Sequence, residues 1–304
     1  MNIYAIIALV SGILNSIFGI LVYQKNKKGL QNRLFALLMA AFSLWTFSYW
    51  IWLVFSHDNE QTGLFWARML NLGATLIPPL YVHWILSTLH LDKSKKKIIY
   101  FAYAITLIFV LFSFSPWYVK GVTKIFVFPF WPQAGFLYSI YIVASYLILN
   151  GYAFYWLIRE YKTSHGFQKS QIRYLLLGSI FGFGGGAFNF PLMYSITMLP
   201  PIGMFFVPLN TVAFTYASIK YRLMNIRFLF AKSILYFLLI SVVGSIFTFT
   251  SFFTADFFQI SNPYGKVGIY MIVSFLLVVL IDPLRKFLAK ITDDIFFKEK
   301  IDYQ

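Results

Sequence analysis

The sequence predicts an all-α protein, a polytopic bundle of about nine transmembrane helices. Of its 304 residues, 60% are hydrophobic and 12% are charged, about half the charged share of a soluble protein. Apolar runs of membrane-spanning length repeat along the chain, and basic residues gather in alternate connections between them. This composition excludes a soluble domain.

Nine apolar runs are long enough to cross a bilayer, which takes about 20 residues of helix. The first is not a cleaved signal peptide, because no basic residue precedes it while Lys25, Lys27 and Lys28 follow it. The runs cover 3 to 23, 34 to 55, 64 to 90, 98 to 117, 136 to 158, 172 to 194, 201 to 219, 233 to 256 and 265 to 281.

The charge distribution predicts the orientation. Of the 25 Lys and Arg residues, 21 fall in alternate connections and the tail, and the other side holds only Arg68, Lys120, Lys124 and Lys266. Basic residues accumulate on the cytoplasmic side, so the N-terminus is expected outside and the C-terminus in the cytoplasm. The net charge of +15 is then a topology signal and does not require nucleic acid. Binding of anionic lipid headgroups is the alternative use of these residues.

Few residues are of the types that build catalytic or metal-binding sites. There is no cysteine, which excludes disulfides, thiolate catalysis and Cys-ligated metals. No pairing of carboxylates, Ser/His/Asp set or Cys/His set appears within the membrane segments, so we expect no enzyme, no catalytic residue, no metal and no cofactor. The longest outward connection, 116 to 134, is rich in Trp, Tyr and Pro and suits an aromatic cap at the membrane interface. Because no outward loop is long enough to fold alone, a ligand must be lipidic, small or another membrane protein.

A polar stripe on the third run carries the predicted site. Its residues recur every three or four positions and so share one helix face. One interpretation is a ligand pocket or polar relay that consists of Arg68, Asn71 and His83 with Asn189 and Asn210. In the other, Arg68 reaches the interface while Asn71 and His83 only hydrogen-bond to neighbouring helices. The whole stripe is Arg68, Asn71, Thr75, Pro79, His83, Ser87 and His90.

Two further features concern packing and coupling. Gly178, Gly182 and Gly186 predict a close helix contact, within the chain or in a homodimer, or else an element that shifts when ligand binds. Asp282 followed by Pro283 predicts that a new cytoplasmic helix starts there. This helix suits a parallel coiled coil or an interfacial amphipathic helix. The residues predicted to couple it to an effector are Asp282, Leu284, Leu288, Ile291 and Ile295.

Three segments resemble a known family. They are YRLMNIRFLFAKSILY at 221 to 236, QKSQIRYLLLGSIF at 168 to 181 and DDIFFKEKIDYQ at 293 to 304. The chain is similar to the N-terminal seven-helix membrane region of bacterial sensor histidine kinases. The resemblance implies a seven-helix sensor region over 1 to 222, two further membrane helices over 223 to 282 and a coupling or interfacial helix over 283 to 304.

The resemblance also implies a function. We expect a sensory input module of a two-component system in the bacterial cytoplasmic (inner) membrane, with a small or lipidic ligand and a cytoplasmic kinase or other output domain as partner. His165, in SHGFQKSQ, lacks the acidic and proline neighbours of a phosphoacceptor. The alternative function is a small-molecule transporter or channel, favoured by the Gly and Pro residues of the sixth and seventh runs. The sequence names neither the stimulus nor the output domain.

Overall fold

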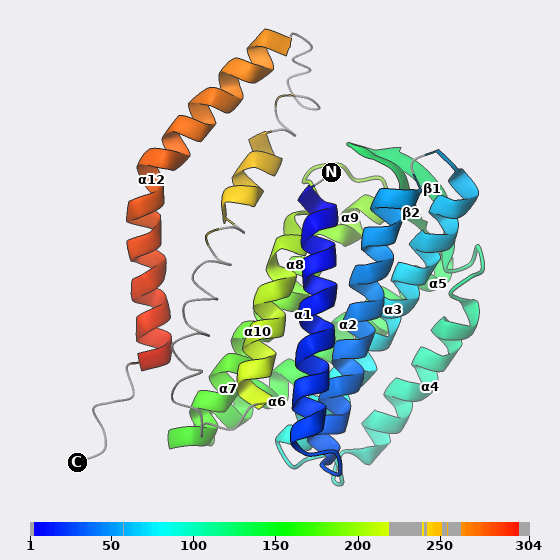
Figure 1. Cartoon of the computed structure of the whole chain (residues 1–304). Helices are drawn as coiled ribbons and strands as arrows, with labels where there is room; N and C mark the ends of the chain where they lie inside the picture. The colour runs from blue at the N-terminus through cyan, green and yellow to red at the C-terminus, as the bar shows by residue number, and fades with distance from the viewer. Residues whose placement is uncertain are drawn as a thin grey trace.

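The chain folds into a helix bundle with one small hairpin at its end (Figure 1). The computed structural model describes residues 3 to 56, 58 to 218, 239, 242 to 250, 254 and 263 to 297. Between residues 3 and 218, seven helical segments follow one another. They are α1 (Ile3–Lys25), α2 (Leu30–Phe55), α3 (Glu60–Thr88), α4 (Lys96–Phe112), α5 (Phe136–Tyr141) continued by η1 (Ile142–Leu149) and α6 (Asn150–Thr163), α7 (Gly166–Ser179) continued by η2 (Ile180–Gly184), α8 (Gly185–Ala187) and α9 (Asn189–Met193), and η3 (Ile202–Phe206) with α10 (Val207–Ser218).

Six of these segments close into a ring. Helix α2 packs between α1 and α3, α3 contacts α6, α6 contacts α7, and α10 packs against both α7 and α1. Helix α4 lies outside the ring against α3 and η1. The interior is strongly aromatic: the Trp84 ring lies 5.4 Å from the Phe35 ring and 5.0 Å from the Phe214 ring, between centroids. Such ring contacts stabilise the packing of the helices. They matter in a membrane because the hydrophobic effect contributes little to helix association in lipid.

Helix α3 begins and continues for local reasons. The Asn59 side chain accepts a hydrogen bond of 3.1 Å from the Thr62 backbone amide, which satisfies one of the free donors at the helix start. Pro78 and Pro79 lie inside the helix without ending it. Proline is tolerated in membrane helices because neighbouring groups satisfy the backbone carbonyls that it leaves free.

A β-hairpin covers one end of the bundle, beside the N-terminus (Figure 1). Strand β1 (Val119–Ile125) pairs antiparallel with β2 (Phe128–Ala134), in a register that places Thr123 opposite Trp131. Phe128 stacks on Trp52 of α2 at 5.9 Å, which fixes the hairpin to the ring. The sequence predicted an aromatic cap in this stretch but not its strands, because both strands are only seven residues long and β2 contains two prolines.

The bounds of two predicted membrane helices differ from the sequence runs. The run at 98 to 117 becomes α4, which ends at Phe112, and the run at 201 to 219 begins as a 3₁₀ turn before α10. Within the described residues, six helices are long and apolar enough to cross a membrane: Ile3–Lys25, Leu30–Phe55, Glu60–Thr88, Phe136–Thr163, Gly166–Met193 and Val267–Lys290. Of the predicted run at 233 to 256, the structure describes residues 239, 242 to 250 and 254, and the rest lies outside the described residues. The chain is an all-α, multi-pass membrane bundle.

The last helix contradicts the predicted restart at Asp282. Helix α12 (Pro263–Phe297) runs without a break through Pro283, so Asp282 is an interior residue and not an N-cap. Proline inside a helix removes one backbone hydrogen bond, and a long apolar helix accommodates this loss by bending. Figure 1 shows α12 as a curved helix beside the bundle.

Candidate functional site

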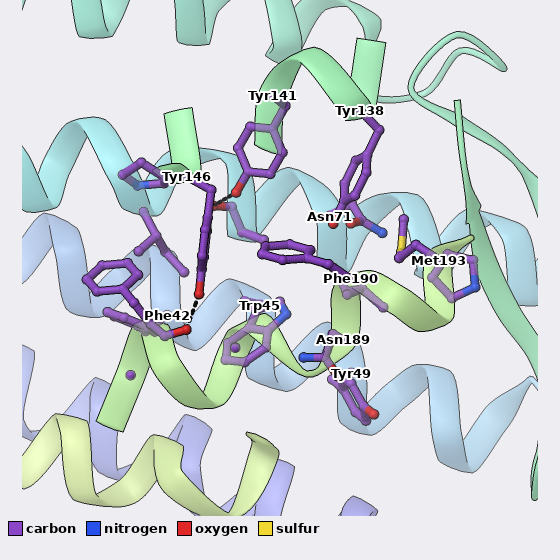
Figure 2. A pocket seen from close by; sticks show the side chains of 18 of the residues that line it. Phe42, Trp45, Tyr49, Asn71, Tyr138, Tyr141, Tyr146, Asn189, Phe190 and Met193 are labelled. Atoms are coloured by element: carbon purple, nitrogen blue, oxygen red, sulfur yellow. Dashed lines mark hydrogen bonds between the residues drawn. The ribbon is translucent and has the colours of Figure 1, made fainter. Parts of the chain in front are cut away.

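A pocket lies inside the ring, next to the hairpin. The space between the atoms that line it is about 740 Å³, a value that includes open space at its mouth. Segments far apart in the sequence supply its walls: α2, α3, β2, α5, η1 and the chain from η2 to α9. Figure 2 shows their side chains converging on one space. Ten of the lining residues are aromatic: Phe42, Trp45, Tyr49, Trp52, Trp131, Tyr138, Tyr141, Tyr146, Phe183 and Phe190.

One wall is an edge-to-face series of aromatic rings. Tyr49 lies 6.5 Å from Trp45 and 5.3 Å from Trp52, and Trp52 lies 5.7 Å from Trp131 of the hairpin, between ring centroids. Trp45, Tyr49 and Trp52 follow at steps of four and three on α2, so they face the same side of that helix. Edge-to-face pairs hold their rings in defined orientations. This wall therefore joins α2 to the hairpin through aromatic side chains.

The opposite wall contains two π-helical turns, η1 and η2. The Tyr146 hydroxyl on η1 donates a hydrogen bond to the Phe183 carbonyl on η2 (Figure 2). The Tyr141 hydroxyl donates to the Ala74 carbonyl on α3 at 3.1 Å. A π turn widens the helix and leaves carbonyls free for such bonds, and these turns recur at functional sites. Tyr146 thus ties η1 to η2, and Tyr141 ties α5, which precedes η1, to α3.

Polar groups in the pocket are few, and several lack partners. Asn71 donates from its Nδ2 to the Ala67 carbonyl at 2.7 Å. Tyr49 Oη, Trp131 Nε1 and Asn189 Oδ1 are buried and have no hydrogen-bond partner among the described residues. Buried polar groups are nearly always satisfied in native proteins. These three atoms therefore mark where a bound molecule or water would complete the site.

Tyr118 connects the pocket region to the start of the hairpin. Its hydroxyl shares a hydrogen bond with Thr75 of α3, and both residues are fully buried. Burial, with smaller contributions from Tyr141 and Tyr138, raises the pKa of Tyr118 well above its usual range. The phenol therefore stays neutral at physiological pH, and the link between α3 and the hairpin does not titrate there.

The structure separates the predicted site residues into two groups. Asn71 and Asn189 line the pocket together, as Figure 2 shows. Arg68 instead donates to the Val119 carbonyl of the hairpin at 3.1 Å, and His83 Nδ1 lies 3.1 Å from the Tyr103 hydroxyl on α4. Asn210 is buried on α10 and is not among the lining residues. The predicted polar stripe is thus divided between the pocket, the hairpin and α4.

The three predicted packing glycines face two neighbours within the chain. A Cβ on Gly178 would lie 2.6 Å from the Phe214 ring of α10, and one on Gly182 would collide with the Asn210 amide. A Cβ on Gly186 would lie 3.2 Å from the Tyr146 hydroxyl, on the pocket side. Gly182 and Gly186 also line the pocket. The glycines therefore bring η2 close to α10 and leave room inside the ring.

Of the predicted coupling residues on α12, the structure describes three side chains. Asp282 is exposed, Leu284 is half-buried and Leu288 is buried. Ile291 and Ile295 continue the same helix, and their side chains lie outside the described part of the structure. All five residues belong to one continuous helix, although the predicted N-cap is absent.

Sequence reasoning missed most of the aromatic residues of the pocket. Trp131 and the tyrosines Tyr138 and Tyr141 come from segments whose relative positions depend on the hairpin. The spacing of Trp45, Tyr49 and Trp52 is a sequence signal that could have indicated this wall, but an aromatic stripe at helical spacing equally fits a buried core. Where the structure describes the chain, it has no group of three His, Asp or Glu residues placed to hold a metal ion.

The comparisons with known proteins agree with this architecture. The family model described as the N-terminal 7TM region of histidine kinase matches residues 7 to 227, which is well over half of the chain. Searches of curated proteins and of solved structures found no match. The chain therefore belongs to the family of N-terminal seven-transmembrane regions of histidine kinases.

Proposed function

We propose that the chain is the sensory input module of a bacterial histidine-kinase-type receptor and that the aromatic pocket receives its stimulus. Binding there would favour one arrangement of the ring, and α12 would pass the change to a kinase or other output domain in the cytoplasm. A ligand shifts such an equilibrium only if it binds the two arrangements with different affinity. The role is sensory and not catalytic, and the cytoplasmic membrane of a bacterium is its proposed location.

The pocket's composite wall is the observation that carries this proposal. Its side chains come from α2, α3, the hairpin, η1 and α9, which are separated by long stretches of sequence. A molecule that contacts all of them links the positions of these elements. The π turns η1 and η2 lie in this wall, and such turns are frequent at functional sites. Family membership independently supports a sensory role.

The division of the chain and its orientation belong to the same proposal. Residues 1 to 222 form the sensor, 223 to 282 contain two further membrane helices and 283 to 304 form the coupling segment. The connections after α1, α3 and α6 gather at the end of the bundle opposite the hairpin (Figure 1). These connections are rich in basic residues, which supports a cytoplasmic location for that end and an outside location for the pocket end.

A fusion to a kinase tests the proposal. The full chain is joined to a dimerisation-dependent histidine kinase after Gln304, and autophosphorylation is measured in vesicles. Gly186→Leu places a side chain in the pocket lining and should change basal kinase output by severalfold. Gly151→Leu is the control, because Gly151 is exposed and a Cβ added there would meet no atom within 4 Å.

Two results would contradict a sensory role. One is unchanged kinase output in Gly186→Leu when the variant folds as the parent does. The other is solute uptake or ion flux in proteoliposomes that Gly186→Leu blocks and Gly151→Leu does not. The second result would make the chain a transporter or channel.

A further inference from the structure

We infer that the pocket binds an uncharged, largely apolar molecule that presents a carbonyl, ether or hydroxyl oxygen to Tyr49 and Trp131. The inference rests on the proposed function, because it names the chemical class of the stimulus. It follows from three buried polar atoms of the pocket that have no partner among the described residues, and from the absence of charge among the described residues that line it.

The unpaired donors define the polar part of the ligand. Tyr49 and Trp131 are each only 2% exposed, and the Tyr49 hydroxyl and the Trp131 Nε1–H have no partner in the described parts of the chain. Both rings flank Trp52, at centroid distances of 5.3 and 5.7 Å. An indole N–H can only donate, and a phenol hydroxyl donates readily, so the group that completes this wall is an acceptor. Asn189 Oδ1 is also unpaired among the described residues and accepts from a ligand donor.

The lining excludes a charged ligand. Among the described residues, none that lines the pocket is Asp, Glu, Lys, Arg or His. An ion would lose its hydration on entry without meeting a counter-charge, and that cost is large in an apolar environment. A cation would gain from the aromatic faces, but the hydrogens of the two donors carry partial positive charge and oppose it. The body of the ligand packs against aromatic rings and is therefore apolar.

A matched series of naphthalene compounds tests this chemistry. The full chain is placed in phosphatidylcholine nanodiscs, and binding is measured by equilibrium dialysis with empty nanodiscs subtracted. We expect 2-acetylnaphthalene, which has one carbonyl acceptor, to bind more tightly than naphthalene and far more tightly than the 2-naphthoate anion. Equal binding of all three, or preference for the anion, would overturn the inference.

Two conservative variants locate the donors. Tyr49→Phe and Trp131→Phe remove one donor each and should weaken 2-acetylnaphthalene binding by roughly three- to tenfold, the effect of one net hydrogen bond. Naphthalene binding should stay unchanged in Tyr49→Phe. Tyr155→Phe and Trp117→Phe are the matched controls, because both side chains are more than half exposed and lie outside the lining. Loss of affinity in the controls, or none in the two pocket variants, contradicts the assigned donors.

A competition arm distinguishes the source of the ligand. Diacylglycerol has ester carbonyls and a free hydroxyl, so its addition to the nanodiscs displaces the probe if the natural ligand is a neutral lipid. Without displacement, a small molecule from outside the membrane carries the same chemistry. Both results support an uncharged oxygen-bearing ligand, provided the naphthalene series is selective.

The binding measurements remain separate from the kinase fusion. If probe binding is selective but kinase output changes neither with the probe nor with Gly186→Leu, the ligand class stands and the sensory function is rejected. If kinase output changes with Gly186→Leu but probe binding is unselective, the sensory function stands and the ligand class is rejected.

Discussion

The ring of helices and α12 both contain helices apolar enough to cross a membrane, but their surroundings are opposite. Trp84 in the ring is 2% exposed and packs between Phe35 and Phe214, whereas Phe275 on α12 is 69% exposed. Figure 1 shows α12 standing beside the ring and not inside it. Lipid solvates apolar side chains as well as a protein interior does, so hydrophobicity alone does not draw a membrane helix into a bundle. The ring holds together through shape, aromatic contacts and hydrogen bonds between its helices.

The first prediction concerns topology, that is, the side of the membrane on which the helix ends of the ring and of α12 lie. Its outcome is all-or-none. If the charge distribution sets one topology for the whole chain, reporter fusions on the two sides give opposite signals. The same side for Lys96 and Lys124 would mean that α4 does not cross the membrane. Cytoplasmic signals are expected from fusions at Lys28, Lys96, His165 and Gln304, and exterior signals at Asn59, Lys124 and Asn262.

The largest expected effect on the free energy of unfolding is a difference between a variant in the ring and a variant in α12. Trp84→Ala removes a fully buried ring and should lower the free energy of unfolding by about 3–5 kcal/mol. Phe275→Ala on α12 should lower it by less than about 1 kcal/mol, because that side chain exchanges only lipid contacts. Unfolding is measured by titration with sodium dodecyl sulfate in mixed micelles. Equal losses in the two variants would show that α12 packs as tightly as the ring.

A smaller effect is expected from glycine substitutions. Gly182→Leu forces a side chain against Asn210 and should destabilise the ring by about 1–3 kcal/mol. The matched variant on α12 is Gly268→Leu, since a Cβ there meets no atom within 4 Å. The two variants are compared by thermal denaturation in detergent. The folded fraction at each temperature is measured by size-exclusion chromatography. An unchanged midpoint for Gly182→Leu would remove the assigned packing role of the glycine.

The smallest effect on stability should come from insertions in α12, which test coupling and not packing. One to seven alanines are inserted after Thr292 in the chain fused to a dimerisation-dependent kinase. Each residue rotates the downstream helix by about 100°, so the output of a dimeric coupling helix should fall and recover with each turn of about 3.6 residues, and it should return most closely to the parent value after seven insertions, about two full turns. Because α12 is continuous from Pro263 to Phe297, an insertion after Thr292 rotates the end of this helix relative to its membrane part.

A flat response across the insertions would contradict the coupling role. Membrane-surface anchoring of the tail through Arg285, Lys286 and Lys290 would then explain its basic residues. Unchanged denaturation of the ring in every insertion variant serves as the control.

Much of the fold follows from local sequence patterns. Apolar run length and alternating charge are properties of consecutive residues, and they were enough to predict a polytopic helical bundle with helical segments close to those observed. Asn59 begins α3 through a hydrogen bond three residues away, which a sequence also records. The restart at Asp282 failed because the cap and proline signal is local, while the continuity of a long membrane helix is decided over its whole length.

The candidate site was less predictable from the sequence. Asn71 and Asn189 were singled out and the structure places both in the pocket lining, but Arg68, His83 and Asn210 lie elsewhere. On α3, residues three or four apart share a face, yet the stripe meets different neighbours along its length: the hairpin at Arg68, the pocket at Asn71 and α4 at His83. Sequence spacing does not specify which element covers each turn.

The sequence by itself determined that this chain resides in a membrane as a helical bundle, because the bilayer imposes length and charge rules on each segment separately. Only the tertiary structure decided the site. A hairpin within a connection brought Trp131 against Trp52 of α2, and two π turns brought Tyr146 to Phe183. These contacts join residues 79 and 37 positions apart, and long-range packing of this kind is settled by the fit of whole helices and not by any local pattern.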